Sequence, residues 1–225
     1  MNERPLRSGL AAGLLFLFAQ TASAGMFGLG GDEKNPSITL TPAEIALDVP
    51  MPVQGEDLSK LLAQTGSGNG LSALKEKAAR KFTAELQRRL HTQLQARFTD
   101  EHVPLVQQGG NLMLRNFLDI NVSKQLNNMQ NSGGKQVEKG YVTLSGSFHL
   151  RLDNPTGTPL REQSVDIADL HVREKYQIER IAGSVGKDTT DDAISRALQE
   201  MVEELLDRTE DQLDADALRD LVSAG

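Results

Sequence analysis

Residue types that carry out acyl transfer gather in the stretch YVTLSGSFHLRLD. A nucleophile, a base and an orienting acid could come from four residues within it: Ser145, Ser147, His149 and Asp153. On a strand, however, residues two apart point side by side, and this stretch lacks the strained elbow and the oxyanion donors that acyl transfer needs. We therefore expect a polar, solvated strand face here and not a serine hydrolase.

Metal and cofactor chemistry find equally little support in the sequence. The chain has four histidines without the paired spacing of metal sites, and it has no cysteine. His149 and His171 lie on strands predicted to be neighbours, but the expected register separates them by about five residues, or about 17 Å. Tryptophan, which would form a sugar platform for glycosidase chemistry, is absent. The sequence predicts no catalytic residue, metal or cofactor, and an enzyme of unrecognised type stays an alternative.

The N-terminal residues indicate export. The apolar run Gly9–Ala19 would rise about 16 Å as a helix, which is about half of a bilayer core. Two arginines precede the run, and small residues at Ala22 and Ala24 occupy the positions that a signal peptidase reads. We expect cleavage after Ala24, so that the mature protein begins at Gly25. With no cysteine to accept a lipid, the sequence predicts a periplasmic protein that is neither lipidated nor membrane-spanning.

Length and charge narrow the class of protein. The 225 residues carry a formal net charge of −7, and this acidic balance argues against a nucleic-acid partner. We expect residues 1–24 to be the signal peptide, residues 25–36 a flexible glycine-rich tail, and residues 37–225 a single α+β domain. Because disulfides are impossible, that domain must depend on an ordinary hydrophobic core.

Helical and short extended segments flank the predicted sheet. Two short strands, Ser37–Leu40 and Ile45–Val49, are kept short or at an edge by neighbouring prolines. In the long helix predicted over Leu71–Phe98, apolar residues recur every four positions, so the apolar stripe winds around the helix. Its two ends should therefore bury against different partners. A C-terminal helix with an ordinary 3.6-residue period starts at Thr189 or Thr190.

Between these helices the apolar residues alternate with polar ones, which predicts antiparallel strands. We expect a hairpin turning at Gly109-Gly110, a loop at MQNSGGKQ, and a strand over Ser164–Arg180 with a bulge near Ala168 or Asp169. One face of the clearest strand should be covered: Val142, Leu144, Phe148, Leu150 and Leu152. The predicted fold class is α+β, a two-layer sandwich in which a long central helix and a C-terminal helix cover one face of an antiparallel β-meander.

Charge is divided between the two helices. Leu71–Phe98 has a net charge of +5, and Asp188–Asp220 has a net charge of −9. The two segments could attract one another as solvated faces. Alternatively, the basic helix could contact anionic lipid or lipopolysaccharide, or a protein partner. The candidate contacts to an anionic partner are Lys77, Arg80, Lys81, Arg88 and Arg89.

These observations predict a non-enzymatic binding or adaptor protein of the bacterial cell envelope, with an envelope protein as the main expected partner. Over residues 37–222 the order of elements resembles small periplasmic two-layer proteins that help to assemble or transport outer-membrane components, such as the lipopolysaccharide-assembly lipoproteins. The chain departs from these because it lacks their lipidated cysteine. The alternative is a carrier that holds an apolar ligand between helix and sheet, in a cavity lined by Leu86, Leu90, Phe148 and Leu150. A binding module instead predicts a solid core at these residues.

Overall fold

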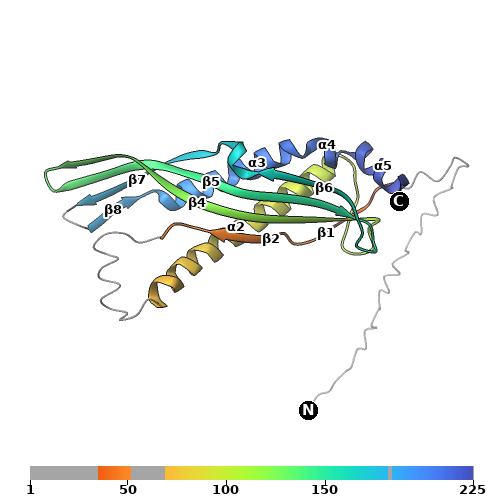
Figure 1. The fold of residues 1–225 in the computed structure, drawn as a ribbon, viewed down its shortest axis with the longest axis horizontal. Coiled ribbons are helices and arrows are strands. Elements are labelled where there is room, and N and C mark those ends of the chain that lie inside the picture. The colour runs from red at the N-terminus through yellow and green to blue at the C-terminus, as the bar shows by residue number, and fades with distance from the viewer. Residues whose placement is uncertain (1–34, 52–68, 182–183, 225) are drawn as a thin grey trace, which may run out of the picture. The chain divides into compact units, whose positions relative to one another are not determined.

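The computed structural model describes residues 35–51, 69–181 and 184–224, all within one compact unit, residues 33–225. The predicted cleavage site at Ala22, Ala24 and Gly25 lies outside these residues. An eight-stranded sheet carries the helices on one face, which confirms the α+β sandwich (Figure 1). The strands are β1 (Ile38–Leu40), β2 (Glu44–Asp48), β3 (Leu105–Val106), β4 (Leu112–Ser132), β5 (Lys135–Asp153), β6 (Pro159–Asp166), β7 (Arg173–Ile181) and β8 (Ser184–Asp188).

The helices are α2 (Asn69–Asp100), α3 (Thr190–Arg208), α4 (Glu210–Leu213) and α5 (Ala215–Ala224), with a 3-10 turn, η1 (Ile167–Leu170), before β7. The long central helix and the C-terminal helix thus form where their periodicity predicts them. None of the helices in the described ranges combines the length and the hydropathy that crossing a bilayer requires.

The β4–β5 hairpin forms the centre of the sheet and is longer than the sequence predicts. The expected loop at MQNSGGKQ is wrong, because pairing continues from Met113 opposite Asp153 as far as Ser132 opposite Lys135. Only Gly133 and Gly134 make the turn, both with positive φ (55° and 78°), the backbone that a two-residue hairpin turn requires. Beyond Asn121, β5 is the only strand that borders β4 within the described residues.

Strand β1 lies between β3 and β4, so the predicted hairpin at Gly109-Gly110 is wrong. Ile38 pairs in parallel with Leu105 on one side and with Leu112 on the other. The Ile38 amide donates to the Pro104 carbonyl (2.9 Å), and the Leu112 amide donates to the Ser37 carbonyl (3.1 Å). Strand β2 also runs parallel to β4. The sheet is therefore mixed, with an antiparallel meander joined by N-terminal strands of parallel orientation.

The interruption predicted near Ala168 is a 3-10 turn and not a bulge. Strands β6 and β7 pair with successive parts of the same edge of β5, and η1 separates them. The Asp166 carboxylate caps η1 by accepting from the Ala168 amide (2.9 Å), and His171 leaves the turn in the left-handed region (φ 58°). Because the capped turn interrupts the alternation between β6 and β7, the apolar residues of β7 can have the opposite parity and still face the core.

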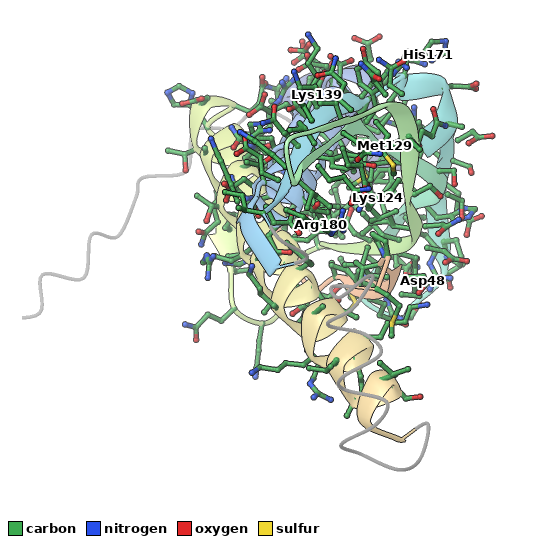
Figure 2. All side chains as sticks on the ribbon, turned by 90° about the vertical axis from the view of Figure 1, so that its left-hand side faces the viewer. Asp48, Lys124, Met129, Lys139, His171 and Arg180 are labelled. Carbon is green, nitrogen blue, oxygen red and sulfur yellow. The ribbon has the colours of Figure 1, made fainter. Side chains whose placement is uncertain are left out.

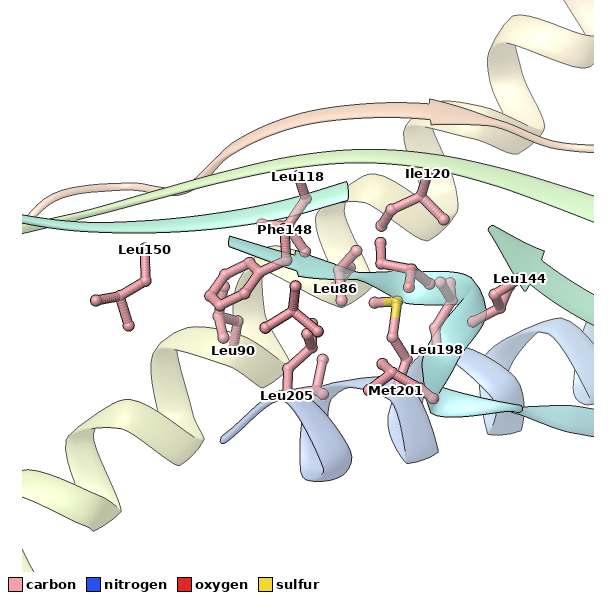
Figure 3. Close-up of a cluster of buried hydrophobic side chains, with 14 of the residues drawn as sticks. Leu86, Leu90, Leu118, Ile120, Leu144, Phe148, Leu150, Leu198, Met201 and Leu205 are labelled. Atoms are coloured by element: carbon pink, nitrogen blue, oxygen red, sulfur yellow. The ribbon is translucent and has the colours of Figure 1, made fainter. Parts of the chain in front are cut away.

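Helices α2 and α3 cover the same face of the sheet and bury one hydrophobic core. On β5 the predicted covered face is confirmed, since Val142, Leu144, Phe148, Leu150 and Leu152 are all buried. In Figure 3, Leu86 and Leu90 of α2 and the α3 residues Leu198, Met201 and Leu205 point toward Phe148 and its neighbours. Each such side chain contributes about 1.5–3 kcal/mol on burial.

Candidate functional site

An apolar groove of about 370 Å³ lies between α2 and the connection from β1 to β2. Leu90 and Leu94 of the helix and Leu40 of β1 line its apolar surface. Exposed residues form the rim: Pro42, Ala84, Gln87, Arg88 and His91. The groove is thus accessible from solvent, and its volume lies in the range of small-ligand sites, about 300–1,000 Å³.

A step in the sheet creates this groove. Pairing of β1 with β4 ends at Leu40 opposite Leu114, and pairing of β2 begins at Glu44 opposite Phe117. Between them the chain leaves the sheet at Thr41, whose amide and hydroxyl both donate to the Leu114 carbonyl (3.1 and 2.8 Å). Pro42 follows and has no backbone N–H to donate to a neighbouring strand. Gln87 spans the groove by donating to the Ala43 carbonyl (3.2 Å).

Asn116 is the buried polar residue among those that line this groove. It is 2% exposed and continues the buried face of β4 between Leu114 and Leu118. Neither its Nδ2 nor its Oδ1 has a hydrogen-bond partner in the described part of the chain. Leaving a buried polar group unpaired costs about 1–3 kcal/mol. The carboxamide at the wall of the groove therefore has hydrogen-bonding capacity that no described residue uses.

A permanent positive charge, that of Arg88, stands at the rim of the groove in an acidic protein. Arg88 and His91 line it, and no aspartate or glutamate belongs to its lining. Arg88 is exposed and makes no ion pair with another described residue. Arg88 is therefore the groove residue that carries a permanent charge and is available to an incoming group.

The other predicted contacts of the basic helix are placed differently. Lys81 pairs with Asp191 of α3 (2.7 Å), and Arg89 pairs with Glu85 (2.8 Å) and donates to Gln199 (3.0 Å). Arg80 pairs with Glu76 on its own helix. Lys77 is exposed, and no ion pair joins it to a described residue. Farther along, Arg97 pairs with Glu210 (2.8 Å), so several of these cations already have partners in the fold.

The four residues predicted to line an apolar cavity divide between core and groove. Leu86, Phe148 and Leu150 are completely buried and pack in the core between helices and sheet. Leu90 belongs to that core and also lines the groove. Leu90 was predicted to line an apolar cavity, and Arg88 was predicted to contact an anionic partner. The structure places both in the lining of one groove, although residues two apart on a helix do not face the same side.

No protein-family model and no curated protein matches the chain. Among solved structures it is similar to a neuraminyllactose-binding hemagglutinin homologue from Helicobacter pylori, with 14% identity and a TM-score of 0.49 over 89% of this chain and 98% of that chain. A minor lipoprotein from Acinetobacter baumannii shows 16% identity and a TM-score of 0.29 over 57% and 85% of the two chains. A lipoprotein from Neisseria meningitidis shows 12% identity and a TM-score of 0.20 over 78% and 99%. At these values the similarity does not extend to a function.

The residues of acyl-transfer type do not assemble into a catalytic set. Ser147 pairs across the sheet with Asp119 and His149 with Phe117, and no hydrogen bond joins Ser147 to His149 in the described part of the chain. Asp153 is buried, and its carboxylate binds Arg115 and Arg151 (3.1 and 2.8 Å). Within the described ranges no three His, Asp or Glu side chains are grouped as metal ligands.

A second buried polar cluster lies toward the hairpin end of the sheet. Glu138 accepts from the Tyr176 hydroxyl (2.9 Å) and contacts Arg180 (3.3 Å) and Lys124 (3.4 Å); Figure 2 shows Lys124 and Arg180 as close neighbours. Burial raises the pKa of Glu138, but these three partners together lower it below its ordinary value. Burial and the neighbouring carboxylate raise the pKa of Tyr176. Because each member has partners, this cluster joins strands β4, β5 and β7 and offers no free group.

Proposed function

We propose that this chain is a non-enzymatic binding protein of the bacterial cell envelope, and that the groove beside Asn116 holds part of its partner. One observation carries the proposal: a buried carboxamide with no partner lies in an accessible apolar groove. Apolar surface supplies affinity, and a few fixed polar groups supply orientation, which is the usual composition of a binding site.

The packing of the core favours a surface binding site over an internal carrier cavity. A carrier of the kind considered above needs free volume beside Leu86, Phe148 and Leu150. Side chains of α3 occupy that region instead, as Figure 3 shows for Leu198, Met201 and Leu205. The binding-module alternative, which requires a solid core there, is therefore the better supported of the two.

The envelope location in this proposal rests on the N-terminal sequence, with its short apolar run and alanine cleavage motif. Periplasmic residence after cleavage at Ala24 is accordingly a part of the proposal with its own test. Peptide mapping of the protein isolated from the envelope fraction should begin at Gly25.

Photocrosslinking in the cells that make the protein tests the binding function. A photoreactive amino acid replaces Gln87 at the groove rim or, as the control, Glu200, which is exposed on α3 and does not line the groove. We expect a discrete adduct from position 87 whose yield falls when Arg88→Glu is added, and none of that mass from position 200. Identical patterns from both positions would refute a binding site at this groove.

A further inference from the structure

The two unpaired atoms of Asn116 indicate which hydrogen-bonding groups a ligand of the groove should present. Its Oδ1 accepts hydrogen bonds and its Nδ2 donates them, and both lack partners. A carboxylate accepts only, so it would leave Oδ1 unpaired, and an ammonium group donates only, so it would leave Nδ2 unpaired. An alkyl chain pairs neither. A residue of an extended peptide presents its amide N–H and its carbonyl on the same edge and can satisfy both atoms at once.

The size and apolar character of the groove fit side chains of such a peptide. At about 30 Å³ for a group the size of a water molecule, a volume of about 370 Å³ admits about a dozen non-hydrogen atoms. This is the size of one or two residues and is smaller than a complete lipid. Leu40, Leu90 and Leu94 provide the surface for an apolar side chain.

Charge defines the residue next to that apolar side chain. Arg88 projects at the rim without an ion pair to a described residue, His91 stands one helical turn further on, and the lining has no acidic residue. An aspartate or glutamate on the ligand would therefore meet positive charge and no repulsion. Its contact with Arg88 would be charge-assisted, in a fork geometry that suits carboxylates.

From these three features we infer that the groove binds an extended segment of a partner protein in which an apolar residue adjoins an acidic one. The backbone of this segment pairs with the Asn116 carboxamide, its apolar side chain contacts Leu90 and Leu94, and its carboxylate contacts Arg88. This inference rests on the proposed function and specifies the class of ligand for the same groove.

Selection from a phage-displayed library of random octapeptides tests the inference. The chain from Gly25 to Gly225 serves as bait, and its Asn116→Leu variant is kept for the binding measurements and is not used in the selection. We expect selected peptides to combine an aliphatic residue with a neighbouring aspartate or glutamate. In fluorescence anisotropy, Asn116→Leu should weaken their binding by about tenfold or more, because two hydrogen bonds to the peptide backbone are lost.

Charge variants on α2 provide the matched comparison. Arg88→Glu should weaken peptide binding by about fivefold to tenfold, with a smaller difference at high salt. Lys77→Glu makes the same change of charge at an exposed position outside the groove and should alter binding less than twofold. Melting curves of all three variants verify that they are folded.

Two results would overturn the inference. The first is a set of selected peptides that bind the wild type and Asn116→Leu equally or that are enriched in basic residues. The second is saturable binding of decanoate that depends on Arg88 but is insensitive to Asn116→Leu, which would identify an anionic amphiphile as the ligand. In this second case crosslinking from position 87 would still yield an adduct, so the proposed binding function would stand while the peptide class would fail.

Discussion

Replacing Asn116 with leucine should stabilise the protein, although it alters a fully buried position. Asparagine and leucine have similar sizes, and Asn116 has two unpaired polar atoms at 2% exposure. Removing unpaired buried polar groups recovers about 1–3 kcal/mol, and apolar contact with Leu90 and Leu94 adds to this gain. We therefore expect the free energy of unfolding to rise by about 2 kcal/mol. With a urea m-value of about 2 kcal/mol/M, the midpoint of denaturation should move up by about 1 M.

Asn111 provides the control for this measurement. Its Oδ1 accepts from the Ser37 amide (2.7 Å) and its Nδ2 donates to the Asn35 carbonyl (2.8 Å), so both polar atoms of its side chain have partners. Asn111→Leu should lower stability by about 1–2 kcal/mol. If Asn116→Leu lowered stability to the same extent, the Asn116 carboxamide would have partners in the free protein, and the reasoning about the groove would be refuted.

Other perturbations test the core, the charges and the processing of the chain. Phe148→Ala should cost about 3–5 kcal/mol in urea denaturation, and a loss below about 1 kcal/mol would contradict the burial of that face. The lowered pKa of Glu138 contributes stability above its unfolded pKa, near 4.5, that is lost as the pH falls through the folded value; Glu138→Gln should flatten this part of the stability–pH profile. Arg89→Glu should lower stability by less than about 1 kcal/mol, with a smaller loss at high salt, because it breaks the contacts to Glu85 and Gln199. Intact-mass measurement of the exported protein should give a chain that begins at Gly25; a mass that includes residues 1–24 would contradict cleavage.

Local periodicity was sufficient to predict where the main helices and strands lie and which faces they bury. The alternation around Phe148 predicted the covered face of β5, and the apolar stripe of α2 predicted a helix that buries its residues from Phe82 onward. Pairings between distant segments were not predictable in this way. Strand β1 enters between β3 and β4 from about 70 positions upstream, and nothing in the sequence VPLVQQGGNLML distinguishes this arrangement from a simple hairpin.

The candidate site was only partly predictable for a related reason. Arg88 was predicted from its charge and Leu90 from the apolar spacing of its helix, but Asn116 was not predicted. The sequence did contain an indication of Asn116, because one amide interrupts an apolar series at a position that must face the core. The series is Leu112, Leu114, Leu118, Ile120 and Val122. Recognising that this amide lacks a partner required the fold, because its neighbours come from β1 and α2, far away in the sequence.

The length of β4 gives the domain two widely separated ends. Asn35, where the described chain begins, is hydrogen-bonded to Asn111 at the start of β4, while the turn at Gly133 closes its far end. At about 3.3 Å per residue, the 21 residues of β4 extend over about 65 Å. Asn35 is thus held about 65 Å from a contact at Gly133. The hairpin sets this separation, which shortens by about 7 Å for every two residues deleted from each of its strands.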